Sequence, residues 1–208
     1  MKDRRLYLVA EPRIRAGPLV DHLPALIHAG VDVVQLRHKT MEAGDLIRWG
    51  TPLAAVCHEM GVPFIVNDRP DVALALGADG VHLGQNDVPV DVARRLYPQG
   101  IIGWSTHTPE EVDAARTMSG IDYFAVGPVN ETPTKPGRPA VGLDLIRHAA
   151  GEGQERPWFA IGGINESNLS EVLHAGARRI VVVRAVTEAG DPVAAVTELR
   201  NTLDEVAL

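Results

Sequence analysis

Short apolar runs recur along the chain, each about four to six residues long and rich in Val, Ile and aromatic residues. Longer segments lie between them, and many of these open with Pro or a capping residue and close with Gly, as helices do. We therefore expect strands and helices to alternate, as in a parallel sheet with covering helices. The runs predicted as strands are Leu6–Val9, Val33–Arg37, Phe64–Asn67, Gly80–Leu83, Ile101–Ser105, Tyr123–Val126, Trp158–Ile161 and Ile180–Val183.

Boundary signals support the helices of this alternation. Pro70 suits the first turn of a helix that stops before Gly77, and Pro109 opens another helix whose first turn carries carboxylates. A third helix is predicted over Glu166–Ala175. Eight strands alternating with eight helices fit a closed parallel barrel of the α/β class, the (β/α)8 TIM barrel, and we expect one such domain over residues 1–208.

A Gly-x-Asp turn precedes several of the predicted strands. It occurs at Ala29–Asp32, Leu76–Asp79 and Ser119–Asp122, and a related turn, Ala175–Arg178, precedes the last strand. We interpret each as a helix stop followed by a turn into a buried strand. This interpretation agrees with a barrel and assigns no function to the turns.

Composition and charge narrow the classes of function. The chain has 208 residues, of which 45% are hydrophobic and 23% charged, so it can bury a sizeable core. A formal net charge of −7 argues against a nucleic-acid-binding surface, which would need clustered Lys and Arg. The apolar run near the N-terminus, Leu6–Ala10, is too short for a signal peptide or a membrane span, so we expect a cytoplasmic protein with no membrane partner. The single cysteine, Cys57, excludes an internal disulfide and is interpreted as a small packed residue.

Polar and glycine-rich segments follow the predicted strands. In a barrel of this type the chemistry lies at the carboxyl ends of the strands, so these segments form one set of candidate site residues. They are Gln35–Lys39, Asn67–Arg69, Gly84–Asp87, Ser105–Thr108, Gly127–Gly142, Gly162–Asn165 and Arg184.

Two aspartates leave neighbouring strands at this rim. Adjacent parallel strands lie about 4.8 Å apart, so Asp68 and Asp87 can bring their carboxylates onto one shared ion. Two carboxylates with carboxamide neighbours and water suit Mg²⁺, which binds few protein ligands together with substrate phosphate. The alternative is that Asp68 caps the helix opening at Pro70 and Asp87 caps the next helix, before Pro89. We favour the magnesium site, because capping explains each aspartate but not why the two occur together.

Basic residues gather at the same rim. Arg37 and Lys39 have the alternating spacing of an extended strand, so both can point the same way, and Lys135 and Arg138 lie in the segment after the sixth strand. On an acidic chain, basic groups beside a magnesium site indicate a polyanionic ligand such as a diphosphate. A solvated surface pair is the alternative for Arg37 and Lys39.

A second anion site is predicted at Gly162–Gly163, directly after the seventh strand. Glycines there allow backbone N–H groups to approach a phosphate, and barrels often bind phosphate at the loops of their last two strands. Between the two anion sites lies Gly127–Gly142, whose length, hydroxyls and cations favour a lid. Thr132 and Thr134 can donate to phosphate oxygens, and Lys135 supplies positive charge.

These motifs, in this order, resemble the thiamine phosphate synthase family, whose barrel enzymes join the pyrimidine and thiazole halves of the vitamin. The resemblance covers nearly the whole chain and is carried by Gln35–Arg37, Asn67–Arg69, Gly80–Gln85, Ser105–His107, Thr132–Lys135 and Ile161–Ile164. It implies a Mg²⁺-dependent transferase that couples a hydroxymethylpyrimidine diphosphate with a hydroxyethylthiazole phosphate, or its carboxylated form, and releases diphosphate.

The resemblance also implies a role for each candidate residue. Mg²⁺ would be held by Asp68 and Asp87. The diphosphate would be bound by Arg37, Lys39, Asn67, Ser105 and Lys135, of which Arg37, Ser105 and Lys135 are the catalytic candidates. The pyrimidine would contact Gln35, and the thiazole phosphate would be bound by Thr132, Thr134, Gly163 and the backbone around Val183 and Arg184. Arg184 departs from the serine that many relatives carry there, and we favour phosphate binding by its guanidinium over an outward orientation. His82 is expected to be a hydrogen-bonded core residue.

Two other functions stay open at this point. A thiazole tautomerase of the same barrel family would need a base near Pro128, and proline cannot transfer a proton. A sensor of thiamine precursors would have no need to stabilise a departing diphosphate, and the intact set of Asp68, Asp87, Arg37 and Lys135 argues against it. We favour the synthase, in which diphosphate leaves, the pyrimidine methylene carries the positive charge and the thiazole nitrogen attacks it. One sequence does not fix the oligomeric state, so a homo-oligomer also stays open.

Overall fold

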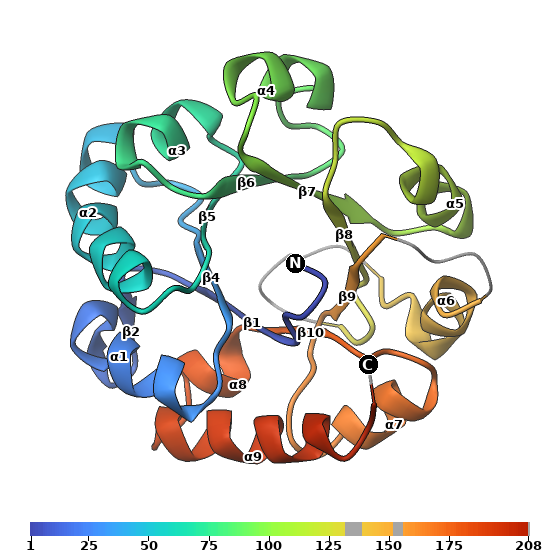
Figure 1. Ribbon diagram of the computed structural model, residues 1–208. Coiled ribbons are helices and arrows are strands. Elements are labelled where there is room, and N and C mark those ends of the chain that lie inside the picture. The colour runs from blue at the N-terminus through green and yellow to red at the C-terminus, as the bar shows by residue number, and fades with distance from the viewer. Residues whose placement is uncertain (132–138, 152–155, 208) are drawn as a thin grey trace.

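The computed structural model describes residues 1–131, 139–151 and 156–207, which form a closed barrel of eight parallel strands (Figure 1). The barrel strands are β1 (Leu6–Ala10), β4 (Val33–Leu36), β5 (Phe64–Asn67), β6 (Gly80–Leu83), β7 (Ile101–Thr106), β8 (Tyr123–Val126), β9 (Trp158–Ile161) and β10 (Ile180–Val182). Strands that follow one another in this order are hydrogen-bonded neighbours, and β1 closes the ring by pairing with both β4 and β10. The predicted (β/α)8 barrel is confirmed.

Helices surround the barrel on its outside (Figure 1). They are α1 (Leu19–Ala29), α2 (Ala43–Glu59), α3 (Pro70–Leu76), α4 (Val90–Leu96), α5 (Pro109–Thr117), α6 (Gly142–Ala149), α7 (Leu169–His174), α8 (Arg184–Thr187) and α9 (Pro192–Asp204). An unpredicted hairpin, β2 (Arg13–Ile14) and β3 (Gly17–Pro18), lies between β1 and α1. Among the helices of the described residues, none is long and apolar enough to cross a membrane.

Two helices begin at the prolines that the sequence indicated. α3 begins at Pro70 and stops before Gly77, whose φ of 59° lies in the left-handed region that glycine tolerates. α5 begins at Pro109, and the Thr108 hydroxyl accepts the Glu111 N–H at 3.2 Å, which satisfies one of the unpaired N–H groups of the first turn. Local signals therefore fixed both starts.

The predicted start of a third helix is wrong. α7 begins at Leu169 rather than at Glu166. The side-chain oxygen of Asn165 accepts the Ser167 N–H at 2.9 Å, which gives the backbone a turn in place of a first helical turn. The last strand is also shorter than predicted, because β10 ends one residue before Val183.

The strand side chains alternate between two hydrophobic cores. Leu6 and Leu8 of β1 point outward to the helices, whereas Tyr7 and Val9 of the same strand lie inside the barrel. The interior cluster consists of Tyr7, Val9, Val33, Ile65, Tyr123, Phe159 and Val181. Because the strands are buried on both faces, their sequences are continuous apolar runs, which explains why the pattern was easy to detect.

The Gly-x-Asp turns lie at the amino end of the barrel, where each aspartate holds a neighbouring strand. Asp32, before β4, accepts backbone N–H groups at the start of β1 at 2.9 to 3.1 Å. Asp79, before β6, accepts the first N–H of β5 at 2.7 Å. Asp122, before β8, accepts an N–H of β7 at 2.8 Å. Each carboxylate thus joins the strand that it precedes to the adjacent strand, a structural role that the sequence did not reveal.

Candidate functional site

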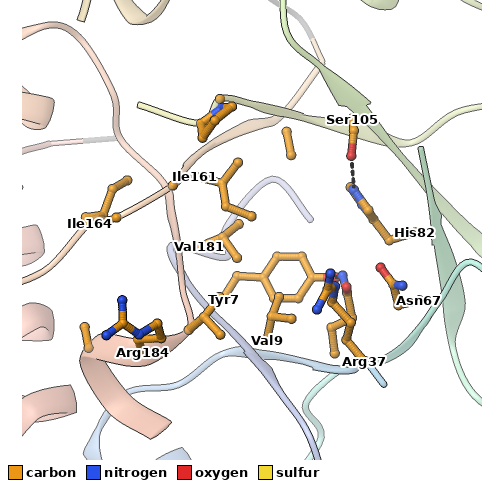
Figure 2. Close-up of a pocket in the computed structure, with 18 of the residues that line it drawn as sticks. Tyr7, Val9, Arg37, Asn67, His82, Ser105, Ile161, Ile164, Val181 and Arg184 are labelled. Atoms are coloured by element: carbon orange, nitrogen blue, oxygen red, sulfur yellow. Dashed lines mark hydrogen bonds between the residues drawn. The ribbon is translucent and has the colours of Figure 1, made fainter. Parts of the chain in front are cut away.

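A cavity of about 280 Å³ opens at the carboxyl end of the barrel (Figure 2). The predicted site residues that line it are Gln35, Arg37, Asn67, Ser105, Gly163, Val183 and Arg184. Val9, Ile161, Ile164 and Val181 add apolar surface. Arg184 and Ile164 lie on the opposite side of the cavity from Asn67, His82 and Ser105 (Figure 2). Residues from distant parts of the chain therefore share one space, with Arg184 at one side and Arg37 with carboxamide and hydroxyl groups at the other.

The remaining predicted residues lie beside this cavity or outside the described part of the chain. Asp68 directly follows Asn67, and Lys39 pairs with it, so both lie next to the cavity wall. Thr132, Thr134 and Lys135 lie outside the described residues.

Arg37 does not belong to a strand as predicted. β4 ends at Leu36, so the alternation of an extended strand does not explain how Arg37 and Lys39 are placed. The Arg37 N–H instead donates to the Ala10 carbonyl oxygen at 2.9 Å, which ties this residue to the end of β1. Arg37 lines the cavity, whereas Lys39 reaches Asp68. The two cationic side chains therefore lie at neighbouring but different parts of the rim.

Asp68 and Asp87 follow β5 and β6, which pair with each other in the barrel. The Asp68 N–H donates to the His82 carbonyl oxygen at 2.8 Å. The φ of Asp68 is 64°, in the left-handed region that residues other than glycine rarely adopt. Its carboxylate forms an ion pair with Lys39. The Asp87 carboxylate accepts the Gly84 N–H at 2.7 Å. Backbone contacts thus orient both aspartates at one part of the rim.

The two carboxyl groups influence each other. Burial raises the pKa of Asp68 above its ordinary value, the neighbouring Asp87 carboxyl raises this pKa further, and Lys39 opposes both effects. A cation bound between the two carboxylates would neutralise their negative charge, so this arrangement favours cation binding. The capping alternative is wrong for these residues, because the N-cap positions of α3 and α4 are Arg69 and Pro89.

A chain of buried polar side chains runs under the cavity. The Gln35 amide nitrogen donates to the Tyr7 hydroxyl at 2.7 Å, and the Tyr7 and Tyr123 hydroxyls are 2.9 Å apart. The Tyr123 hydroxyl lies 3.0 Å from His82 Nδ1, and His82 Nε2 lies 3.0 Å from Ser105 Oγ, the contact that is dashed in Figure 2. The expectation that His82 is a buried, hydrogen-bonded residue is confirmed. It also lines the cavity, and sequence reasoning missed Tyr7 and Tyr123 altogether.

Glycines after β9 allow two loops to approach each other closely. A Cβ on Gly162, whose φ is 112°, would lie 2.4 Å from Pro128 Cα, and a Cβ on Gly163 would lie 2.8 Å from Asn130 Cβ. The Asn130 N–H donates to the Gly162 carbonyl oxygen at 3.0 Å. The glycine pair therefore lets the segment after β8 pack onto the β9 end, and it leaves backbone at the cavity surface.

Arg184 starts α8 at the other side of the cavity. Its side chain is about half exposed (49%), and Nε donates to the Glu188 carboxylate at 2.8 Å, one helical turn later. Glu188 also lines the cavity, so the guanidinium is held at the cavity margin. An arginine in this position can present its remaining N–H groups to an anion.

Comparisons with known proteins agree on one family. A family model described as thiamine monophosphate synthase matches residues 6–186. The chain is 51% identical to the thiamine-phosphate synthase of Acidothermus cellulolyticus, over 100% of this chain and 98% of that protein. It is 52% identical to the thiamine-phosphate synthase of Thermus thermophilus, with 98% of each chain covered. A solved thiamine phosphate pyrophosphorylase from Pyrococcus furiosus has 36% identity and a TM-score of 0.85, and the match covers 97% of this chain and 96% of that one.

Proposed function

The chain belongs to the thiamine monophosphate synthase family and is a transferase, and from this premise we propose how its cavity performs the coupling. The substrates are a hydroxymethylpyrimidine diphosphate and a hydroxyethylthiazole phosphate, plain or carboxylated, and the products are thiamine phosphate and diphosphate. One observation carries the assignment of roles. Asp68 and Asp87 follow the paired strands β5 and β6, and Asp68 directly follows Asn67, which lines the cavity together with Arg37, so the acidic groups lie at the rim beside the polar wall of the cavity.

The two aspartates fit a magnesium ion. In the part of the chain that the structure describes, no group of three or more His, Cys, Asp or Glu side chains gathers in a way that could hold a metal. Asp68 and Asp87 offer two carboxylates, and burial together with the neighbouring Asp87 carboxyl raises the pKa of Asp68. Mg²⁺ suits such a site, because it keeps several waters and takes its other ligands from substrate phosphates. When bound, it would neutralise charge that develops on the leaving diphosphate.

The residues around the aspartates would bind the diphosphate and the pyrimidine. Arg37 and Lys39 supply positive charge, and Asn67 and Ser105 supply N–H and O–H donors. Gln35 lies at the base of the cavity and is 4% exposed, and its amide nitrogen donates to the Tyr7 hydroxyl. Its carbonyl oxygen therefore remains to accept from the amino group of the pyrimidine.

The reaction needs bond cleavage at the pyrimidine methylene and no side-chain nucleophile. The C–O bond to diphosphate breaks, and both electrons leave with the diphosphate oxygen, where Arg37 and Ser105 bind it. The electron-rich aminopyrimidine delocalises the positive charge left on the methylene carbon. The lone pair of the thiazole nitrogen then forms the new C–N bond. The apolar side chains of Val9, Ile161 and Val181 keep water from this carbon.

The thiazole phosphate would lie at the opposite side of the cavity. There Gly163 and the backbone at Val183 offer N–H groups, and Arg184 offers a guanidinium at the start of α8. Thr132, Thr134 and Lys135 are proposed as further phosphate ligands, and they lie outside the described residues.

A direct assay tests this function against its two alternatives. The purified protein is mixed with both substrates and Mg²⁺, and thiamine phosphate and diphosphate are measured over many turnovers. We expect both products in equal amounts. Stoichiometric diphosphate release without turnover would favour a sensor, and thiazole rearrangement without diphosphate release would favour a tautomerase.

A further inference from the structure

We propose that the side chains Gln35, Tyr7, Tyr123, His82 and Ser105 form a directional hydrogen-bond relay that makes Ser105 a donor into the cavity. The relay would do this by fixing the neutral tautomer of His82 with its proton on Nε2. The identity of the anion that Ser105 meets rests on the proposed function, whereas the direction of the relay does not. In this inference Tyr123 is a positioning residue, and it is not among the described residues that line the cavity.

The direction follows from the donors and acceptors that each group has. The Gln35 amide nitrogen can only donate, so the Tyr7 oxygen accepts that bond at 2.7 Å. The Tyr7 oxygen could accept a second bond, but the Tyr7 hydroxyl is buried, and among its contacts in the described residues only the Tyr123 oxygen can accept its hydrogen. The hydrogen of Tyr7 is therefore used for the contact with Tyr123 at 2.9 Å. The hydrogen of Tyr123 is in turn used for His82 Nδ1 at 3.0 Å. Because Nδ1 accepts, Nε2 carries the proton and donates to Ser105 Oγ at 3.0 Å.

Burial makes this order stable. Tyr7 is 1% exposed and Tyr123 is fully buried, so water does not compete for their hydroxyls. Burial also raises the pKa of both tyrosines, which keeps each of them protonated and able to donate. The ring of Phe159 packs edge-on against both tyrosine rings, at centroid distances of 5.5 and 5.6 Å, and fixes their orientation.

A glycine on β7 leaves the space that the relay needs. A Cβ on Gly103 would lie 2.2 Å from Tyr123 Cζ and 2.5 Å from His82 Nδ1, so any larger residue would separate these two groups. Gly103 lies inside a strand, where glycine normally weakens the sheet, and close approach of another group is the usual reason for it. The close approach here is the contact between Tyr123 and His82.

The direction matters for the ligand. With the relay in this order, the Ser105 hydroxyl hydrogen is free to point at an anion, and the Gln35 carbonyl oxygen is free to accept from an amino group. In the reverse order Ser105 would donate to His82 and present only lone pairs to the anion, which is repulsive. The relay therefore couples recognition of the pyrimidine amino group to recognition of the diphosphate, although Gln35 and Ser105 are on different strands.

The first test measures the tautomer of His82 directly, in the protein without substrates. The protein is labelled with ¹⁵N in its histidine rings, and two-bond ¹H–¹⁵N spectra are recorded at pH 8. We expect the Nε2–H tautomer in the parent and a mixture of both tautomers in Tyr123→Phe, which removes the hydroxyl that donates to Nδ1. The matched control Tyr97→Phe removes a tyrosine hydroxyl next to α4, outside the relay, and should leave the parent spectrum of His82. An Nδ1–H tautomer in the parent, or an unchanged His82 in Tyr123→Phe, would overturn the relay.

The second test measures its effect on anion binding. Inorganic diphosphate with Mg²⁺ is titrated into the parent, Tyr123→Phe and Tyr97→Phe by calorimetry. Loss of one oriented donor to an anion should weaken binding about tenfold in Tyr123→Phe and leave the control unchanged. If Tyr123→Phe does not fold, Tyr7→Phe breaks the same chain one step earlier and replaces it in both tests. Equal diphosphate affinity in the relay variant and the parent would overturn the proposal.

Kinetic measurements separate this inference from the proposed function. In Tyr123→Phe we expect the KM for the pyrimidine diphosphate to rise about tenfold, with the KM for the thiazole phosphate unchanged. A merely structural role would change the melting temperature without this split. Absence of thiamine phosphate synthesis in the parent would refute the proposed function, and the His82 spectrum would still decide the direction of the relay.

Discussion

The two ends of the barrel use the same residue in opposite ways. At the amino end, Asp32, Asp79 and Asp122 each accept backbone N–H groups of the strand beside them. At the carboxyl end, burial and the neighbouring Asp87 carboxyl both raise the pKa of Asp68. All five follow short apolar or glycine-containing stretches, and composition alone does not separate them. The end of the barrel at which an aspartate lies separates the observed structural role from the proposed metal-binding role.

The contrast has a physical cause. A strand begins with N–H groups that need an acceptor, and a carboxylate is a strong one, so an aspartate at the amino end is satisfied within the fold. At the carboxyl end, two carboxylates placed side by side repel each other, and Lys39 compensates only part of this repulsion. A cation bound at this place would lower the repulsion between the two carboxylates. The predictions below test this division.

The largest effect is expected for Asp68→Asn, which keeps the shape of the side chain and removes its charge. Turnover should fall about 100-fold or more, because the diphosphate loses part of its metal site, and the magnesium concentration for half-maximal rate should rise. Stability should change little, since the variant loses both the repulsion from Asp87 and the ion pair with Lys39. Steady-state diphosphate release over a series of magnesium concentrations measures the turnover and the magnesium requirement. Asp79→Asn, at the amino end, is the control and should keep parental turnover. An Asp68→Asn variant as active as the parent would remove the metal assignment.

The next effect should appear at the amino end as a loss of stability. Asp32→Ala leaves the N–H groups of Arg5 and Leu6 without their acceptor and removes a partner of Arg200. We expect the free energy of unfolding to fall by about 2 kcal/mol, with kcat within about twofold of the parent value. Urea unfolding and the turnover assay give the two quantities. A large loss of kcat in a variant that remains folded would contradict the separation of the two ends.

A smaller effect is expected for Arg184→Ala. The KM for the thiazole phosphate should rise about tenfold, which corresponds to about 1.4 kcal/mol, and the KM for the pyrimidine diphosphate should stay the same. Arg95→Ala is a matched control, because Arg95 pairs with Asp91 one helical turn away, as Arg184 pairs with Glu188. An unchanged KM in Arg184→Ala would mean that the guanidinium does not bind the phosphate.

The smallest effect at neutral pH is expected for Cys57→Ala, in the core between barrel and helices. The lost packing should cost about 1 kcal/mol of stability, with unchanged turnover. Burial raises the pKa of the Cys57 thiol from 9.0 to about 12. Between these values the unfolded chain releases the proton and the folded chain keeps it, so stability falls as pH rises.

The alkaline profile offers a second measurement on this variant. The stability difference between parent and Cys57→Ala should shrink by about 1 kcal/mol per pH unit above pH 9.5, as measured by urea unfolding. A constant difference up to pH 10.5 would show that the thiol is not shielded as the structure indicates.

The fold was predictable because the relevant signals are local. Each barrel strand is buried on both faces, so its apolar run is short, continuous and bounded by glycine or proline, and all eight were identified. The start of α7 was not identified, because a side chain of Asn165 competes with the first helical turn. The candidate site was predictable to the extent that strand ends meet at one rim, which brought Gln35, Asn67 and Ser105 into one set.

The relay under the cavity was not predictable in the same way. Tyr7 and Tyr123 lie in apolar runs, where a tyrosine looks like any other core residue. Gly103 gave a local hint, because a glycine within a strand indicates that another group approaches the backbone closely. The sequence does not say which group that is. The partners are brought together by barrel closure, with Tyr7 on β1 and Tyr123 on β8.

The sequence by itself determined the order of strands and helices, because burial on both faces and helix-end residues act over a few neighbouring positions. It also predicted that candidate site residues follow the strands, and Gln35, Asn67 and Ser105 line one cavity. Only the tertiary structure decided which strand ends face each other, which aspartates join two neighbouring strands and which lie beside another aspartate, and in which direction the buried hydrogen bonds run. Those outcomes depend on contacts between residues far apart in the chain, and such contacts exist only after the sheet has closed on itself.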